Sequence, residues 1–244
     1  MNTLGIILAR ADSQGLKDKH FQSLCGRAVI EYTFDHAAAS RMITRTVVST
    51  DCPQVKQLAR ASGLQVIDRP PRLATATASV QDAMVHAMET VEQGGTFMAD
   101  ALVVLYGNVP VRGDSVIDRA LELLQKTNCD SVRSFCPVGK WHPQWMCRVE
   151  GDRAESVVPG SIHLRQDLAP LFLHDGAVVA VSRASMLRGK ANPRDPHAFF
   201  GIDRRAILTE PGETVEIDER KDLYLAEAML RERNLIGMPK ARVA

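Results

Sequence analysis

The sequence predicts an α/β protein in three layers, with a mostly parallel sheet covered by helices on both faces. Two short, nearly all-apolar runs at residues 4–9 and 101–106 are typical of strands that are buried on both faces. Segments with helical spacing alternate with such runs, and polar or glycine-containing turns separate them. In sheets of this kind ligands bind beyond the carboxyl ends of the strands, so the polar residues that follow each strand are the candidate site residues.

The first half of the chain supplies a regular series of expected elements. Pro53 suits the first turn of a helix and Gly63 suits its end, while Asp114 is expected to be an N-cap. The helix that begins at Thr77 has the clearest apolar spacing, and Gly94 follows it. The series is strand 4–9, helix 28–40, strand 43–49, helix 53–61, strand 64–67, a helix from 77, strand 101–106 and a helix after 114.

The second half departs from this regularity. Over residues 137–175 the alternation stops, and an aromatic, irregular stretch contains Trp141 and Trp145. An insertion of this kind in a regular α/β chain is usually functional or interfacial. An apolar strand then resumes at 175–181. We therefore expect one domain over residues 1–244 with an excursion at about 137–175.

Two carboxylates precede the last expected helix. Glu216 and Asp218 alternate with Val215 and Ile217, and on a strand this alternation places both acids on one face. Carboxylate oxygens suit Mg²⁺ when substrate phosphates complete its shell. The alternative is that Asp218 caps the last helix, because acids are common at that position. The residues by themselves leave both interpretations open.

Composition narrows the class of protein. The 244 residues carry 30 Lys and Arg against 29 Asp and Glu, a balance that gives no indication of a nucleic acid or an anionic membrane as partner. No apolar run approaches the roughly 20 residues that span a bilayer, and the start lacks the layout of a signal peptide. The five cysteines are odd in number and form no Cys-x-x-Cys pair. A soluble cytoplasmic protein with reduced thiols is expected.

The loop after the first strand is the most informative stretch. Residues 10–20 are polar, include Gly15, and carry fixed cations at Arg10 and Lys19. Backbone N–H groups and cationic side chains can converge there on phosphate oxygens, although an ordinary surface connection remains the alternative. The loop matches neither the Walker A motif nor Gly-x-Gly-x-x-Gly.

The sequence of this region resembles that of the CMP-sialic acid synthetase (acylneuraminate cytidylyltransferase) family, which is related to the CMP-KDO synthetases. The resemblance begins with Leu8-Ala9-Arg10-x-x-Ser13-x-Gly15, Lys19 and Leu24-x-Gly26-Arg27-x-x-Ile30, and continues with His142-Pro143-x-Trp145 and Arg165-Gln166-Asp167-Leu168-x-Pro170. It implies a nucleotide-diphospho-sugar transferase-like fold with a protruding arm that forms a homodimer. Asp12, Gln14 and His20 depart from the usual glycine, lysine and asparagine of the family.

The resemblance also implies an activity. It is the transfer of CMP from CTP to a 2-keto-3-deoxy acid sugar, such as a sialic-acid-like nonulosonate, with release of pyrophosphate. By the same resemblance Arg10, Lys19 and Asp218 act in catalysis, and Asp218 with Glu216 binds Mg²⁺ or Mn²⁺. The implied nucleotide-binding residues are Leu8, Ala9, Arg10, Ser13, Gln14, Lys19, His20, Arg69 and Ser79. The implied acceptor-binding residues are Tyr106, Gly107, Asn108, Arg165, Phe199 and Phe200, with Arg165 able to grip the sugar carboxylate.

Other functions remain open at this stage. An octulosonate is an alternative acceptor, and because Tyr106 and Asn108 match the loop of neither reference group, we expect an acceptor different from both. Nucleotide-sugar glycosyltransferases normally carry Asp-x-Asp, which does not occur in this sequence. A catalytically decayed relative that only binds a nucleotide is a third possibility, which Asp12 and Gln14 keep open.

Overall fold

The computed structural model describes residues 1–11, 15–160 and 162–237, so the expected nucleotide-binding residues Ser13 and Gln14 lie outside the described residues. The strands are β1 (Thr3–Leu8), β2 (Ser23–Leu24), β3 (Arg27–Ala28), β4 (Arg45–Thr50), β5 (Gln65–Asp68), β6 (Ala101–Tyr106), β7 (Ser131–Pro137), β8 (Cys147–Glu150), β9 (Arg153–Ser156), β10 (Phe172–Ser182) and β11 (Arg204–Leu208). The α-helices are α1 (Val29–Ala39), α2 (Pro53–Ala61), α3 (Val80–Glu92), α4 (Val116–Thr127), α5 (Arg183–Lys190) and α6 (Arg220–Gly237).

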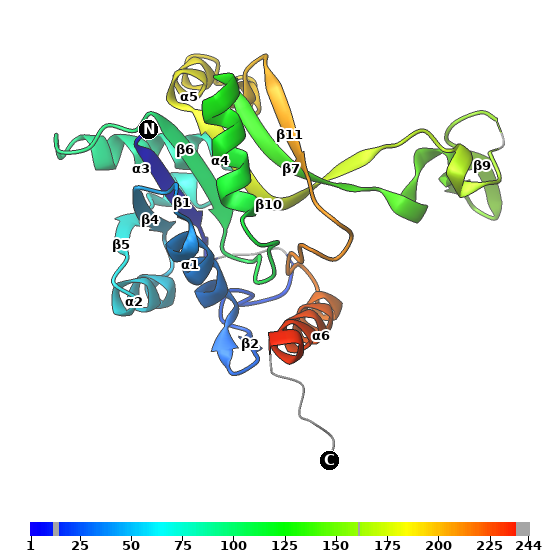
Figure 1. Ribbon diagram of the computed structural model, residues 1–244, viewed down its shortest axis with the longest axis horizontal. Helices are drawn as coiled ribbons and strands as arrows, with labels where there is room; N and C mark the ends of the chain where they lie inside the picture. Colours follow the sequence, from blue (N-terminus) through cyan, green and yellow to red (C-terminus); the bar gives the residue numbers. More distant parts are fainter. Residues whose placement is uncertain (12–14, 161, 238–244) are drawn as a thin grey trace.

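The central sheet is mostly parallel, as the sequence predicts. Its seven described strands run in the order β11-β7-β10-β6-β1-β4-β5 (Figure 1). Only β10 is antiparallel to its neighbours β6 and β7 among these strands. The carboxyl ends of β1, β4 and β6 therefore meet at one edge, where the polar segments that follow them come together.

Helices cover both faces of the sheet, which confirms the three layers. On one face Phe34 of α1 and Leu121 of α4 join the core over Ile7 of β1. On the other face Met84 of α3 and Met186 of α5 pack in a second core. Among the helices that the structure describes, none has both the length and the apolar character needed to cross a bilayer.

Several local expectations are wrong. Residues 215–218 do not form a strand: Val215 makes a single bridge to Val111, although Val215 and Ile217 are buried as the alternation predicts. Asp114 is not an N-cap, because α4 begins at Val116 and the residue before it, Ser115, has a left-handed backbone (φ 57°). The strands β7 and β11 and the helix α5 were not predicted from the sequence.

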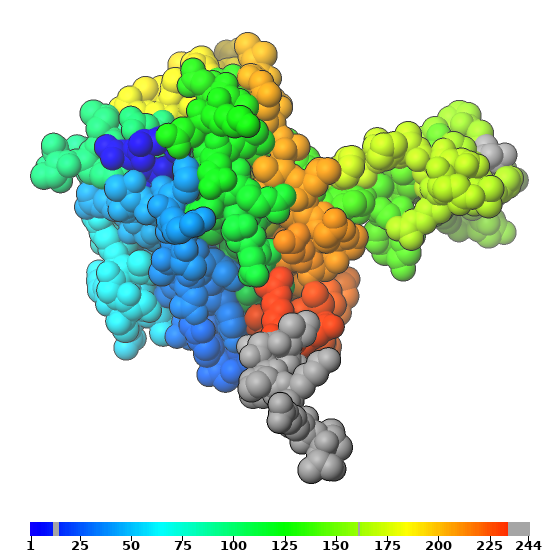
Figure 2. Space-filling model, viewed as in Figure 1, coloured from blue at the N-terminus to red at the C-terminus, as the bar shows by residue number. Residues whose placement is uncertain are grey.

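The excursion forms an arm, defined as residues 138–171, that extends away from the body of the molecule (Figures 1 and 2). The β8–β9 hairpin lies on the arm. Large apolar side chains are exposed along it and at its base, namely Trp141, Trp145, Met146, Val149, Val157, Leu164, Leu171, Phe172 and Leu173. An exposed apolar surface of this size is typical of an interface.

Candidate active site

A cavity of about 260 Å³ lies at the carboxyl ends of β1 and β6. Parallel pairing of these two strands sets Leu8 directly beside Tyr106, so the segments that follow both strands open into the same space. The described residues that line the cavity are Leu8, Arg10, Lys19, His20, Arg69, Leu73, Thr75, Ala76, Ala78, Ser79, Val80, Ala83, Tyr106, Asn108 and Glu216. Many residues expected from the sequence are therefore brought together.

Arg10, Lys19 and Arg69 supply the positive charge that faces this cavity. Arg10 Nη1 donates to the carbonyl of Thr75 at 3.0 Å. Arg69 is 8% exposed and donates to the Ser49 carbonyl at 2.6 Å and to its hydroxyl at 3.1 Å. Burial lowers the pKa of Arg69 to about 10, so its guanidinium remains protonated at neutral pH. This charge suits an anionic ligand such as a triphosphate.

His20 lies against the same cavity but carries no charge at neutral pH. Its side chain is buried, and burial together with the neighbouring Lys19 cation lowers its pKa to about 4. Within the described part of the chain, His20 Nδ1 is buried without a hydrogen-bond partner. The histidine that replaces the usual asparagine therefore offers a neutral ring nitrogen at the cavity.

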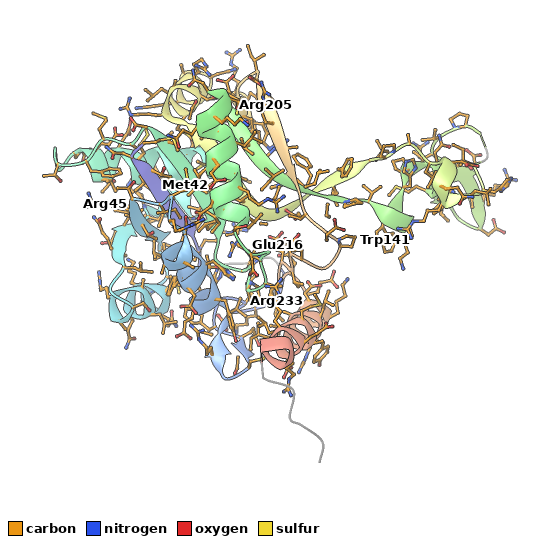
Figure 3. All side chains as sticks on the ribbon, viewed as in Figure 1. Met42, Arg45, Trp141, Arg205, Glu216 and Arg233 are labelled. Atoms are coloured by element: carbon orange, nitrogen blue, oxygen red, sulfur yellow. The ribbon has the colours of Figure 1, made fainter. Side chains whose placement is uncertain are left out.

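Asn108 positions the two carboxylates. Its Nδ2 donates to Glu216 Oε1 at 3.1 Å, to the Ile217 carbonyl at 3.0 Å and, more weakly, to Asp218 Oδ1 at 3.4 Å. The backbone carbonyl of Asn108 in turn accepts a hydrogen bond from the Ile217 N–H at 2.8 Å. Asn108 thus fastens the segment from 216 to 218 to the end of β6, in the body of the molecule where Figure 3 labels Glu216.

The interpretation of Asp218 as a helix cap is wrong. The side chain that accepts from the backbone N–H groups before α6 belongs to Asp222, at 2.9 Å from the Asp218 nitrogen and 2.7 Å from the Glu219 nitrogen. The Asp218 carboxylate is instead 2.8 Å from Lys19 Nζ. Lys19 is therefore both a cation of the cavity and the counter-charge of Asp218.

Glu216 and Asp218 fit a hard divalent cation. Burial raises the pKa of Glu216 above its ordinary value, the hydrogen bond from Asn108 opposes this, and the negative charge of Asp218 raises it further. A cation between the acids would relieve that repulsion, and carboxylate oxygens are the ligands that Mg²⁺ prefers. The described residues contain no cluster of three or more His, Cys, Asp or Glu side chains arranged to hold a metal ion, here or elsewhere, so the two carboxylates would need substrate oxygens to complete a shell.

Gly15 lets the first loop reach the acidic segment. The N–H of Leu16 donates to the Asp218 carbonyl at 2.8 Å, and a Cβ on Gly15 would lie 2.5 Å from that oxygen. Any side chain at this position would therefore force the two segments apart. The loop with Lys19 and the segment with Asp218 meet because of this close backbone contact.

The remaining cavity wall is built from β1, β6 and the start of α3. Ser79 is the N-cap of α3, since its hydroxyl accepts from the Asp82 N–H at 3.0 Å, and it faces the cavity. Ala9 and Gly107 do not line the cavity themselves: Gly107 donates to the Leu8 carbonyl at 3.0 Å, and a Cβ on Gly107 would lie 3.3 Å from Ala9 Cβ.

Tyr106 lines the cavity from the end of β6. Burial raises its pKa to about 12, the negative charge of Glu216 adds to the rise, and the Arg133 guanidinium opposes it. The phenol hydroxyl therefore stays protonated at neutral pH and can donate a hydrogen bond.

Four expected acceptor residues do not line this cavity: Gly107, Arg165, Phe199 and Phe200. Arg165 is on the arm, where its Nη2 would lie 3.6 Å from a Cβ on Gly139. Phe199 and Phe200 belong to a short 3₁₀ helix, η5 (Ala198–Phe200). Both rings are buried in the core that contains α3 and α5. The Phe200 ring also contacts Arg133, whose guanidinium carbon is 4.3 Å from the ring centre.

Two further residues hold the site: Asp51, which the sequence indicates as a polar residue directly after a strand, and Arg112, which sequence reasoning missed. Asp51 accepts from the Ala11 N–H at 2.9 Å and so anchors the start of the first loop. Arg112 is 2% exposed and donates to the carbonyls of Tyr106 (2.9 Å), Val109 (2.8 Å) and Ala177 (2.9 Å). The sequence does contain an indication of this role, because Arg112 is a single charged residue that follows the apolar residues Val109, Pro110 and Val111.

Comparison with known proteins gives a consistent result. The family model described as Cytidylyltransferase matches residues 4–145, more than half of the chain. An N-acylneuraminate cytidylyltransferase of Streptococcus agalactiae serotype V is 31% identical over 226 residues, covering 91% of this chain and 52% of that protein. A CMP-N,N'-diacetyllegionaminic acid synthase of Legionella pneumophila is 27% identical, covering 94% of this chain and 97% of that protein.

The fold is also similar to a solved structure, that of a CMP:2-keto-3-deoxy-manno-octonic acid synthetase complexed with CTP. The TM-score is 0.71 at 19% sequence identity, over 96% of this chain and 100% of that chain. Against the Streptococcus agalactiae proteins, the chain spans about half the length of the curated relatives that it matches.

Proposed function

This chain belongs to the cytidylyltransferase family, and from this we propose that it transfers CMP from CTP to a 2-keto-3-deoxy acid sugar. The observation that carries the proposal is one cavity at the sheet edge that three cations and Glu216 line, with the Asp218 carboxylate held next to it by Lys19 and Asn108. A nonulosonate is the preferred acceptor class, since two relatives that match more than 90% of the chain are named for such sugars.

The proposed reaction needs no covalent enzyme intermediate. The anomeric hydroxyl of the sugar attacks the α-phosphorus of CTP, an oxygen–phosphorus bond forms, and the bond to the β-phosphate breaks as pyrophosphate leaves with the electron pair. The hydroxyl proton passes to solvent. The protein contributes positioning and charge: Arg10 and Lys19 hold the β- and γ-phosphates, while Arg69 and Ser79 orient the cytidine.

Glu216 and Asp218 would hold the Mg²⁺ or Mn²⁺ ion. When bound, the ion supplies charge neutralisation at the phosphate oxygens. Lys19 remains beside Asp218 and limits the negative charge that the incoming triphosphate meets. Asn108 keeps both carboxylates facing the same point.

The proposal is tested by pyrophosphate release with ATP, CTP, GTP and UTP, each offered with a panel of 2-keto-3-deoxy nonulosonates and octulosonates. We expect CTP to be preferred, at least one acid to be used, and N-acetylneuraminate to be a poor acceptor because Tyr106 replaces the usual amide. We also expect a chelator to abolish turnover, because the two acids alone repel the triphosphate. Equal rates with ATP, or full activity in chelator, would contradict the proposal.

We also propose that two copies of the chain associate through their arms. The arm exposes Trp141, which is 67% exposed and lies on the arm outside the body of the molecule where Figure 3 labels Glu216. Apolar surface of this kind is usually covered by a partner, and a symmetric dimer covers the same patch on both copies.

Light scattering at micromolar concentration is expected to give twice the chain mass of 26.8 kDa. Trp141→Asp should shift the protein toward the single-chain mass, because it places a charge in the apolar contact. Ile202→Asp is the matched control, since Ile202 is 96% exposed but lies outside the arm. A parent protein at 26.8 kDa would contradict the dimer.

A further inference from the structure

Arg133 is a half-buried cation for which the described part of the chain provides no hydrogen-bond acceptor and no acidic partner. Other arginines differ in this respect. Arg69 and Arg112 donate to backbone carbonyls, and Arg183 pairs with Glu92 at 2.9 Å. A cation withdrawn from water without a partner is unfavourable in the folded protein, so a position of this kind is a candidate for binding an anion.

Two phenyl rings fix the Arg133 guanidinium. Its central carbon lies 4.3 Å from the centre of the Phe200 ring and 5.0 Å from that of Phe135. Stacking on aromatic faces restrains a planar guanidinium and leaves its N–H edge free for a planar oxyanion. Phe200, which is buried, is therefore a support for this cation and not a direct wall of the cavity.

The position of Arg133 relates it to the candidate active site. On β7 it is paired with Val179 of β10, and Val179 is paired with Val104 of β6. Tyr106 lies two residues further along β6 and therefore on the same face of the sheet. Tyr106 and Arg133 are near enough for each to influence the pKa of the other. Arg133 thus lies beyond the Tyr106 wall, on the side away from the Arg69 and Ser79 region.

We propose that Arg133 binds the carboxylate of the acceptor sugar and selects acceptors that carry it, an inference that rests on the proposed function. In a 2-keto acid sugar the carboxylate is attached to the carbon that bears the attacking hydroxyl. A guanidinium near Tyr106, which lines the cavity, can therefore hold that carbon next to the phosphate being attacked. A guanidinium also binds a carboxylate through two parallel N–H bonds, which fixes orientation as well as position.

The first test compares Michaelis constants for the two substrates. Arg133→Met should raise the acceptor KM by about 10- to 100-fold, the range expected for losing a charge-assisted hydrogen-bonded pair, and leave the CTP KM within about twofold. Arg133→Lys should recover part of the loss because it keeps the charge without the planar fork. Arg205→Met is the matched control, since Arg205 lies on the neighbouring β11 at the surface and pairs with Asp203.

The second test changes the acceptor and not the protein. A carboxamide analogue of the acid that is turned over should be a poorer substrate for the parent protein, whereas Arg133→Met should treat the acid and the amide nearly alike. The unchanged CTP KM shows in the same assays that the variant is folded. Normal turnover by the parent with an unchanged acceptor KM in Arg133→Met would overturn this inference alone. Absence of turnover by the parent with every acid would contradict the proposed function and this inference with it.

Discussion

Replacing Lys19 with alanine is expected to lower kcat/KM for CTP by about 100-fold or more, the scale seen when one charge partner of a transition state is removed. The structure gives a second reason for a large effect. Lys19 Nζ lies 2.8 Å from Asp218, and its side chain is only 15% exposed, so its removal leaves two carboxylates facing the triphosphate without their counter-charge. Steady-state kinetics of pyrophosphate release measures the loss.

Lys17→Ala is the matched control for this change. Lys17 lies two residues earlier in the same loop and is exposed, so we expect its replacement to change the rate by less than about threefold. Lys19→Arg, which keeps the charge, should recover part of the activity. A loss of less than about threefold in Lys19→Ala would show that Lys19 is a solvated lysine and not part of the site.

Replacing Arg112 with methionine is expected to destabilise the protein by about 3 to 5 kcal/mol, because several buried acceptors lose their donor at once. Arg112 donates to the carbonyls of Tyr106 and Val109, to the Thr33 hydroxyl and toward His36 Nδ1. Burial lowers the pKa of Arg112 to about 9, so it still carries its charge at neutral pH. For a chain of this size the loss corresponds to a fall in Tm of roughly 10 °C, measured by circular dichroism.

Arg119→Met provides the comparison for stability. Arg119 makes one hydrogen bond to a carbonyl, that of Leu208 at 2.7 Å, at the protein surface, and its replacement should cost less than about 1 kcal/mol. An Arg112→Met protein within about 1 kcal/mol of the parent would contradict the role of Arg112 as the clamp of the Tyr106–Arg112 loop.

The sequence predicts the sheet well where period and composition agree. β1 and β6 are apolar runs buried on both faces, and α2 begins at Pro53 and ends before Gly63 as expected. The prediction of secondary structure fails where isolated hydrogen bonds hold a segment in place of the regular pairing of a strand. Residues 215–218 alternate like a strand, yet they are held by Asn108 and by the backbone at Leu16 instead of by a neighbouring strand.

The site is only partly visible in the sequence for a similar reason. Arg10, Lys19 and Arg69 follow strands or lie in the first loop, and their position at one edge follows from a parallel sheet. The pairing of Lys19 with Asp218 joins residues 199 positions apart, and only the three-dimensional fold brings them together. The support of Arg133 by Phe135 and Phe200 depends likewise on the β7 strand, which the sequence analysis did not identify.

Phosphorus NMR of one reaction is the most direct test of the proposed transfer of CMP from CTP to an acid sugar. The parent protein is mixed with CTP, Mg²⁺ and the panel of 2-keto-3-deoxy acids, and the signals of the three CTP phosphates are followed with time. If the chain transfers CMP as proposed, we expect a new CMP phosphodiester signal that grows together with an equal amount of pyrophosphate, and only when an acid is present. CTP that stays intact with every acid, or that is hydrolysed to CDP and phosphate without a CMP-sugar product, would contradict it.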